Sequence, residues 1–447
     1  MSGDSELFGD LPEQPVPEAP GRRTPRLRQP ERHQLGWQVA AIDDLVARDH
    51  PVRAVWAFVQ GLDLRALHDA VKAREGAPGQ APPAPGLMMA LWLWATVDGV
   101  GSARQLARLC EQHLAYRWLC GGVSMNYHTL SDFRVGHAAV LDQLLAGGVA
   151  ALVEQGLVAL DVLAQDGLRV RAAAGAGSFR RRERLAKLAA AAKARVERLS
   201  AEREADPAAG DRRQRAAQQR AAREREERVK AALDRMSELE AERTRRETTN
   251  KTAVSRQKEP RASTTDAEAR VMKLADGGFR PAYNMQIVSA PKGQVIVAVD
   301  IDTTGSDRGL ARPALEQLDA AGTRPSDYLV DGGFTKNEDI EWAHESGVKL
   351  WCPPAHSKHG TDPYAPRRDD KPGVADWRRR MVSEPGKALY KQRSQAECPN
   401  AWARRMGLAQ LSVRGKAKAR AMLLWFALAH NMLRAFALRR AVIAATT

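Results

Sequence analysis

Apolar residues recur every three or four positions over the first third of the chain, where they predict a helical region. The pattern runs through residues 37–156 and is divided by a Pro-rich break. It follows residues 1–32, which are rich in Pro, Glu, Gly and Arg and show no periodicity. We therefore predict a disordered tail over 1–32 and a helical domain over 33–156. Near the end of that domain, Thr129 or Ser131 is placed to cap a short helix.

The pattern changes to that of β-structure after the helical domain. Apolar residues from 157 to 170 are interrupted by Asp161 and by Asp166 with its following glycine. This predicts a buried strand that ends near a carboxylate and a turn. Further along, two β-rich runs over 282–290 and 293–307 predict a hairpin.

Short strands and helices alternate after that hairpin. A helical stretch leads to a buried strand over 328–330, a helix that runs to about Ser346, and another strand over 348–352. Thr335 and Glu338 have the spacing of a capping box at the start of the second helix. The order of strands and helices predicts an α/β fold with mixed strand directions.

Residues 180–246 interrupt this α/β pattern with a segment dense in Arg, Lys and Glu. A loose heptad of apolar residues is broken at Pro207 and Gly210 and then resumes, which predicts two antiparallel helices joined at the break. Such a charged surface is most often a solvated face, and contact with DNA or protein is the alternative interpretation. The apolar heptad positions are Leu185, Leu188, Ala192, Leu199, Val229, Ala232, Met236 and Leu239.

The net charge narrows the class of partner. The chain has 69 Lys and Arg against 54 Asp and Glu, a formal charge of +15, which favours association with a polyanion such as nucleic acid.

The start of the chain lacks a signal-peptide pattern. The apolar run over 421–438 is interrupted by His430, Asn431 and Arg434, so we predict a buried helix there and not a membrane span. The four cysteines are scattered, which argues against a zinc site and is typical of a reducing cytoplasm.

Two aspartates and one glutamate are candidate metal ligands. Asp166 and Asp331 both stand at a predicted strand end before glycine, where reactive groups of α/β sheets collect, and Glu397 lies on a later helix. Three carboxylates can hold a pair of Mg²⁺ ions for in-line phosphoryl displacement, although each carboxylate alone is a weak signal. The pair His356 and His359 offers only two nitrogens in a loop flanked by Pro and Gly, so we interpret it as an ordinary surface loop.

The segment around Glu397 carries a second pattern. Tyr390, Arg393 and Glu397 are three and four positions apart, so on a helix they would share one face. That face suits a phosphate and a metal ion. The alternative is a solvated stripe of ion pairs, which is common on helix surfaces.

These residues resemble the signature of the DDE transposases of bacterial insertion sequences, and the resemblance extends over residues 34–436. Members of that family carry Tyr, Arg, Glu and Lys on the last catalytic helix, separated by two, three and six residues. Tyr390, Arg393 and Glu397 match this spacing. Arg404 stands where the family has Lys, so the charge is kept but the compact ammonium group is not.

The two aspartates also lie in segments that resemble the family. The segment "AQDGLRVRAAAGAGSF" gives Asp166 as the first aspartate, preferred over Asp161 because the glycine and a run of basic and small residues follow it. The segment "LVDGGFTKNEDI" gives Asp331 as the second.

The resemblance implies an RNase H-like catalytic core, with a mixed sheet flanked by helices, formed by residues 157–179 and 262–440. It also implies an all-α N-terminal DNA-binding domain over 33–156 and a charged helical-hairpin insertion over 180–261.

The implied activity is DNA cleavage at the ends of a mobile element and strand transfer to target DNA by two-metal-ion phosphoryl transfer. The partners would be the terminal inverted repeats and target DNA, bound by a homodimer in the cytoplasm at the nucleoid, with no membrane. The catalytic and metal-binding residues would be Asp166, Asp331 and Glu397 with two Mg²⁺ or Mn²⁺ ions, and the DNA-binding residues Tyr390, Arg393, Arg404, Arg414 and Lys416. A metal-dependent nuclease that joins nothing and an inactive DNA-binding remnant are the alternatives.

Overall fold

The structure is a computed structural model in which residues 41–73, 81–205, 212–249, 259–354 and 362–446 are described. The tail over 1–32, the joint at Pro207 and Gly210, and the pair His356 and His359 lie outside these residues.

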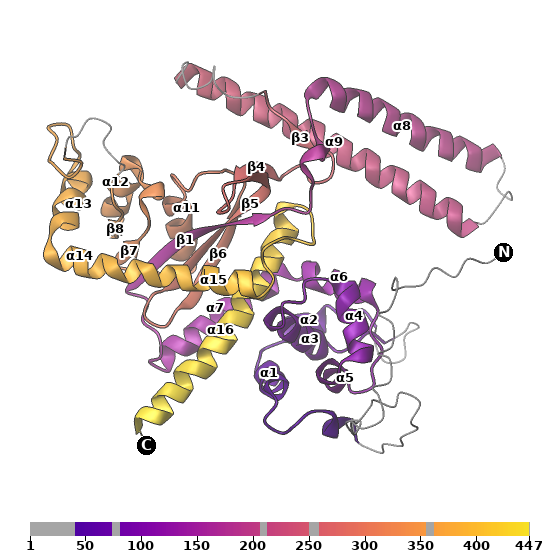
Figure 1. The fold of residues 1–447 in the computed structure, drawn as a ribbon, viewed down its shortest axis with the longest axis horizontal. Coiled ribbons are helices and arrows are strands. Elements are labelled where there is room, and N and C mark those ends of the chain that lie inside the picture. Colours follow the sequence, from indigo (N-terminus) through magenta and orange to yellow (C-terminus); the bar gives the residue numbers. More distant parts are fainter. Residues whose placement is uncertain (1–40, 74–80, 206–211, 250–258, 355–361, 447) are drawn as a thin grey trace, which may run out of the picture. The chain divides into compact units, whose positions relative to one another are not determined.

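Helices make up the regular structure of the described residues before the first strand, as predicted (Figure 1). They are η1 (Ile42–Leu45), α1 (Pro51–Gln60), α2 (Arg65–Asp69), α3 (Pro85–Val97), α4 (Ala103–Gln112), α5 (Leu114–Cys120), α6 (Tyr127–Gly136) and α7 (Ala138–Glu154). The predicted cap of α6 was wrong. Asn126 is its N-cap, and its side-chain oxygen accepts from the backbone N–H of His128, so Thr129 and Ser131 lie inside the helix.

A mixed sheet forms the centre of the remaining chain. Its strands are β1 (Val162–Arg171), β4 (Arg270–Lys273), β5 (Phe279–Ala290), β6 (Val295–Asp302), β7 (Asp327–Leu329) and β8 (Lys349–Trp351). The order is β4-β5-β1-β7-β8, and β6 also pairs with β5. Strand β5 is antiparallel to β1, β4 and β6, whereas β1, β7 and β8 are parallel to one another. The predicted hairpin is therefore β5–β6, and the α/β class with mixed strand directions is confirmed.

Strand β1 is longer than predicted. It continues through Asp166 and Gly167 to Arg171 and pairs with β5 along this whole stretch, so the predicted turn at Asp166 was wrong. Asp-Gly is typical of turns in isolation, but here β5 supplies hydrogen-bond partners on the other side.

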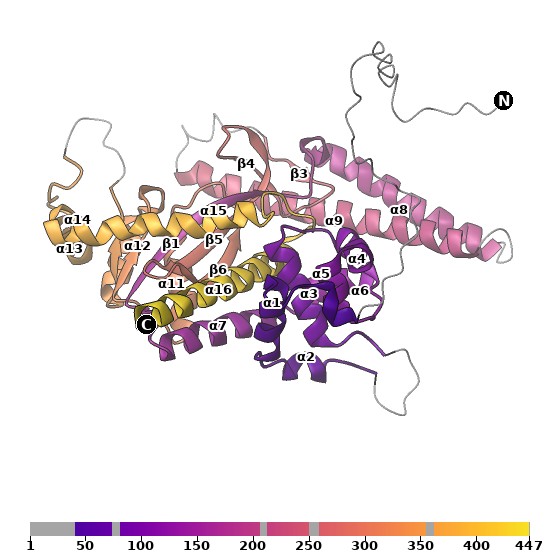
Figure 2. The ribbon, with the colours of Figure 1, turned by 60° about the horizontal axis from the view of Figure 1, so that its bottom comes forward.

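Helices cover the two faces of the sheet (Figure 2). They are α11 (Ala311–Ala320), α12 (Asn337–Glu345), α13 (Pro372–Val382), α14 (Glu384–Tyr390), η4 (Lys391–Ala396), α15 (Glu397–Arg405) and α16 (Lys416–Thr446). The predicted capping box before α12 was wrong. Lys336 is the N-cap residue and makes no side-chain cap, while the Thr335 hydroxyl donates to the carbonyl of Pro353 at 2.7 Å.

Helix α16 joins the N-terminal helices to the sheet. Leu423 and Trp425 belong to a buried cluster that also contains Trp92 of α3 and Leu168 of β1. The Trp425 indole N–H donates to the backbone carbonyl of Arg134 at the end of α6. The helical region and one face of the sheet therefore share a hydrophobic core. The predicted buried helix over 421–438 is confirmed, since this stretch lies within α16 and most of its side chains are buried.

The length and composition of α16 alone would permit a membrane span. In its most apolar window, 67% of the residues are buried inside the protein, as is usual for the core helix of a globular protein. The bent pair α6 and α7, taken as one span, is also long and apolar enough by length and composition.

The charged segment forms the predicted helical hairpin. Helices α8 (Arg182–Ala205) and α9 (Arg212–Thr249) contact each other, and a short ladder of β2 (Phe179–Arg180) with β3 (Ala262–Ser263) lies at their base. Arg182 pairs with Glu240 at one end, and Arg203 donates to Gln219 at the other. These contacts show that the two helices are antiparallel.

Candidate active site

The register of the parallel strands places two aspartates on one face of the sheet. Ala164 of β1 lies opposite Leu329 of β7. Because side chains alternate along a strand, Asp166 and Asp331, each two positions further on, project to the same side. Asp331 follows β7 and begins the short helix η3 (Gly332–Phe334), where its Oδ1 accepts from the Gly333 N–H at 2.7 Å.

The third carboxylate comes from a helical run that crosses this face. The run changes from α-helix in α14 to 3₁₀-helix in η4 and back to α-helix in α15, which begins at Glu397. Pro399 contributes to this change, because it has no N–H to donate to the Gln395 carbonyl and its ring would clash with that carbonyl in an α-helix. Tyr390, Arg393 and Glu397 therefore do not lie on one regular α-helix as predicted, although they belong to one helical run.

One guanidinium stands between all three carboxylates. Arg393 Nη2 lies 3.0 Å from Asp166 Oδ1 and 3.7 Å from Asp331 Oδ2, while Nη1 lies 2.8 Å from Glu397 Oε1. The Arg393 side chain is only 15% exposed. Three acids from distant parts of the chain thus converge on a single cation.

An asparagine completes the surroundings of Asp166. Asn400, one turn after Glu397, donates from Nδ2 to Asp166 Oδ2 at 2.7 Å. Asn400 is buried, and its Oδ1 has no hydrogen-bond partner among the described residues. The other oxygen of Asp166 accepts from Arg393 and from the Gly167 N–H. Each oxygen of Asp166 is therefore held by at least one donor.

The pKa of Asp166 is raised to about 6. Burial is the largest cause, because it disfavours the charged carboxylate. The Arg393 charge opposes this shift, whereas the neighbouring charges of Asp331 and Glu397 add to it. Asp166 therefore changes protonation near neutral pH, unlike an ordinary aspartate.

A polar network on the opposite face of β1 explains the glycine next to Asp166. Gln165 donates to Gln286 at 2.7 Å, and Gln286 and Asn284 both donate to Asp307 Oδ1, at 3.0 and 2.7 Å. A Cβ atom at Gly167 would lie 2.5 Å from that same oxygen. Glycine is therefore required at position 167 because a side chain would not fit there within the strand, and not because the chain turns.

Two comparisons with family models identify the class of protein. Residues 260–432 match the model described as a transposase DDE domain, and residues 40–135 match a transposase domain (DUF772). The chain belongs to the insertion-sequence DDE transposases. No curated protein and no solved structure matches it.

Family membership explains the sheet and the basic charge of this transposase. The curled mixed sheet with its helical N-terminal region is consistent with the RNase H-like fold of DDE transposases. Transposases bind DNA and are nucleic-acid-processing enzymes, and this family generally uses divalent metal ions.

The transposase site offers carboxylate oxygens, the type of donor atom that a hard divalent cation prefers. Among the residues that the structure describes, no three His, Cys, Asp or Glu side chains lie close enough together to hold one ion directly. In their place, the three carboxylates surround the positive charge of Arg393. Carboxylate oxygens are the ligands that Mg²⁺ prefers, and Asn400 holds one of them through its Nδ2.

The structure separates the predicted DNA-binding residues into two groups. The Tyr390 hydroxyl donates to the Val330 carbonyl at 3.1 Å, next to Asp331, and Arg393 is engaged by the carboxylates. Arg404 and Arg414 are exposed on the surface, and Lys416 is half-buried at the start of α16.

Two polar residues near the site were missed from the sequence, while the rival to Asp166 lies away from the site. Asp161, the rival first aspartate, precedes β1, where its carbonyl accepts from the Ser326 N–H, so it lies at the far end of the strand from Arg393. Asn400 and Asp307 were missed. Neither belongs to a recognisable motif, and only the fold brings them beside Asp166 and Gly167.

Proposed function

We propose that this transposase cuts DNA at the ends of its element and transfers the freed 3′ strand to target DNA. The observation that carries the proposal is the convergence of Asp166, Asp331 and Glu397 on the guanidinium of Arg393. Three acids around one positive charge are the arrangement expected of a cation site built for phosphoryl transfer.

In this proposal the three carboxylates hold two divalent ions, Mg²⁺ or Mn²⁺. When bound, such ions supply the Lewis-acid chemistry that activates an attacking oxygen and stabilises a leaving one. Arg393 leaves the centre of the carboxylates to make room. Asn400 keeps Asp166 oriented through Oδ2, so that Oδ1 is presented to the site.

The rest of the chain binds and positions DNA. We propose that residues 33–156 recognise the terminal inverted repeats, and that 157–179 with 262–440 form the catalytic domain. Basic side chains at or near the surface then contact backbone phosphates without reading sequence. The proposed contacts to the DNA backbone are Arg404, Arg414 and Lys416, with Tyr390 beside the cleaved strand.

Synapsis of two element ends requires at least two active sites, so the protein is proposed to act as a homodimer on nucleoid DNA. Arg420, near these basic residues, pairs with Asp142 and has Asp300 nearby, so we assign it no phosphate contact.

The test is cleavage and strand transfer on a labelled duplex that carries the element's end, with Mg²⁺. We expect nicked and joined products from the intact protein and neither from Glu397→Gln. Glu384→Gln is the matched control, because Glu384 lies on the same helical run and pairs only with Lys387 among the described residues.

Each other outcome has a defined meaning. Nicking without joined products would indicate a nuclease. DNA binding without cleavage by either protein would indicate an inactive remnant. Cleavage that survives Glu397→Gln would show that the third carboxylate is misassigned.

A further inference from the structure

The α8–α9 hairpin carries its positive charge unevenly along its length. Its base, residues 182–192 and 231–245, contains six Lys and Arg against five Asp and Glu. The distal half, residues 193–205 and 213–230, contains eleven against six. The hairpin is thus close to neutral where it joins the protein and basic where it extends away.

The base of the hairpin is anchored by packing and ion pairs. Leu185, Met236 and Ala262 form part of a small buried cluster there. Arg182 pairs with Glu240, and the Arg235 guanidinium donates to the Thr303 hydroxyl just after β6. The base therefore fixes the hairpin to the sheet, and its positive and negative charges are nearly balanced.

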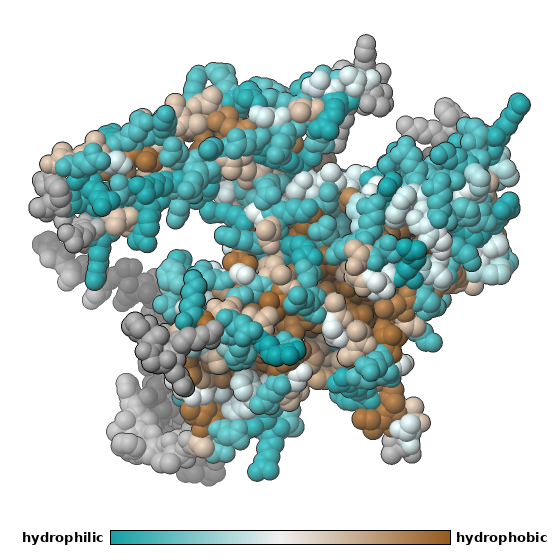
Figure 3. Space-filling view, turned by 180° about the vertical axis from the view of Figure 1, so that it is seen from behind, coloured by the Kyte–Doolittle hydropathy of each residue, from teal (hydrophilic) through white to brown (hydrophobic). Residues whose placement is uncertain are grey.

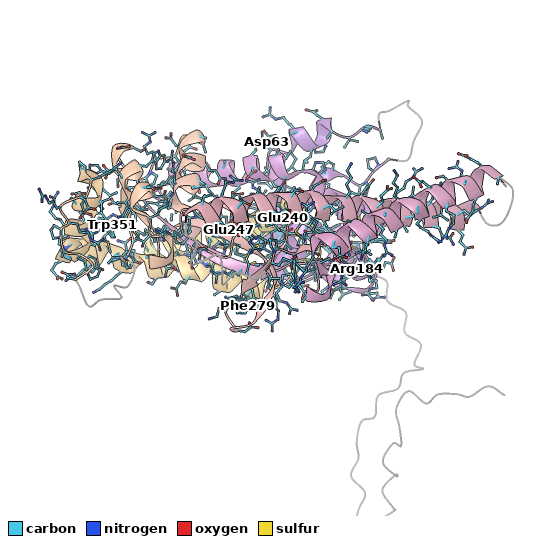
Figure 4. The ribbon with its side chains drawn as sticks, turned by 90° about the horizontal axis from the view of Figure 1, so that it is seen from above. Asp63, Arg184, Glu240, Glu247, Phe279 and Trp351 are labelled. Carbon is cyan, nitrogen blue, oxygen red and sulfur yellow. The ribbon has the colours of Figure 1, made fainter. Side chains whose placement is uncertain are left out.

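The distal half lacks such anchors. The buried side chains between its helices include only small ones, such as Val229, and no Phe, Trp or Tyr occurs anywhere in 182–249. Figure 4, where Glu240 marks the anchored part of α9, shows both helices extending well beyond it, and Figure 3 shows a mostly hydrophilic hairpin surface. Packing within the protein therefore does not explain the length of the hairpin.

Several distal cations have no partner among the residues that the structure describes. The side chains are exposed and form no ion pair or hydrogen bond with any residue that the structure describes. They are Arg195, Arg223, Arg225 and Lys230.

We propose that the distal half of this hairpin is a docking surface for duplex DNA, which it holds through phosphates without reading sequence. The inference rests on the proposed function, in which DNA lies across the carboxylates. Charge complementarity favours a polyanion, and protein interfaces instead depend on aromatic and Met anchors, which the distal half lacks. At 1.5 Å per residue, residues 213–230 of α9 span about 27 Å, which is most of one turn of duplex.

The hairpin is also well placed for this role. Its first helix follows shortly after β1, the strand that carries Asp166, so its base is tied to the candidate active site. DNA held by the distal half would therefore be held at a set distance from the carboxylates.

The test compares the salt dependence of DNA binding for three forms of the full chain. The distal variant replaces Arg195, Arg223, Arg225 and Lys230 with Gln. The control variant makes the same change of charge elsewhere, at Arg184, Lys292, Lys349 and Arg440, which are also exposed. Binding is measured to two duplexes of equal length, one with the element's end and one of unrelated sequence, over a range of salt concentrations.

We expect the distal variant to lower the slope of log affinity against log salt by about 2 to 4, since each lost phosphate contact lowers it by about 0.9. Affinity at low salt should fall about tenfold or more, equally for both duplexes, whereas the control variant should change little. Helix content measured by circular dichroism should stay unchanged, because Gln and Arg have similar helix propensities.

Several results would overturn this inference. An unchanged slope in the distal variant, or an equal change in the control variant, would do so. A loss confined to the element's end would indicate sequence reading, and a changed oligomeric state with normal DNA binding would indicate a protein partner. If the intact chain does not bind DNA at all, it is the proposed function that fails.

Discussion

Replacement of Arg393 by Gln tests whether the guanidinium holds the three carboxylates together when no metal is bound. The change removes the positive charge at 3.0 Å from Asp166, 3.7 Å from Asp331 and 2.8 Å from Glu397. Three negative groups are then left beside one another with no cation between them. The variant should therefore be less stable without metal and should recover when a divalent ion is added.

The size of the effect follows from the exposure of each partner. Asp166 is 15% exposed, and removing one partner of a buried ion pair costs about 3–5 kcal/mol. Asp331 and Glu397 are 40% and 63% exposed, so solvent screens their pairs to about 0–1 kcal/mol each. Removing the buried charge of Arg393 also removes its desolvation cost, which offsets part of the summed loss from the three ion pairs. We therefore expect a loss of about 3 kcal/mol, or roughly 3–4 °C in Tm for a chain of this length.

The assay is thermal unfolding with and without Mg²⁺, together with calorimetric titration of Mn²⁺. In the parent protein an incoming ion must displace the guanidinium, whereas in Arg393→Gln it need not. The variant should therefore bind the ion at least about tenfold more tightly, which corresponds to about 1.4 kcal/mol of removed competition. Arg404→Gln is the matched control, because Arg404 is an exposed arginine on the same helical run and has no ion-pair partner among the described residues.

Two results would refute this reasoning. If Arg393→Gln is as stable as the parent without metal, the observed ion pairs contribute nothing to the fold. If the variant binds Mn²⁺ more weakly than the parent, Arg393 organises the carboxylates for the ion and does not compete with it.

Two further predictions concern Asp166. Asn400→Leu removes the 2.7 Å hydrogen bond to Asp166 and should weaken Mn²⁺ binding about 10- to 100-fold by calorimetry. Gln395→Leu, which loses bonds from Gln294 and Cys398 but none to a carboxylate, should leave it unchanged. Since the pKa of Asp166 is raised to about 6, the folded protein takes up a proton between pH 6 and 4 that the unfolded chain does not. The metal-free protein should therefore gain about 2 kcal/mol of stability from this group as pH falls from 6 to 4, and Mn²⁺ binding should weaken over the same range. Asp166→Asn should abolish this pH dependence of urea unfolding, and its persistence would show that another group is responsible.

The parts of the site that could be predicted from sequence are those set by local spacing. Tyr390, Arg393 and Glu397 are close in sequence, so any helical form of the segment brings them near one another. Asp331 was predictable because a short buried strand and two glycines mark the strand end. The heptad of the α8–α9 hairpin is likewise a local pattern, and its antiparallel pairing follows from it.

The parts that could not be predicted depend on contacts between distant segments. Strand β1 passes through Gly167 only because β5 pairs with it, and the space for that glycine is filled by Asp307, 140 positions away in sequence. Asn400 belongs to the site only through its hydrogen bond to Asp166, which is 234 positions away in sequence. A single polar residue with no motif gives no signal of such a partner.

The hydrogen bonds of Arg393 bear on how one residue can serve both the carboxylates and DNA. Its two Nη atoms are engaged by carboxylates, while its Nε is buried and has no hydrogen-bond partner among the described residues. An unpaired buried donor costs about 1–3 kcal/mol, which offsets part of what the ion pairs contribute. A cation that takes over the carboxylates would free both Nη atoms at the position where a phosphate must approach. We propose that the ion pairs seen here and the phosphate contact expected from the sequence are successive states of one side chain. Because Arg393→Gln removes both states, the Mn²⁺ titration made without DNA reports on the first state alone.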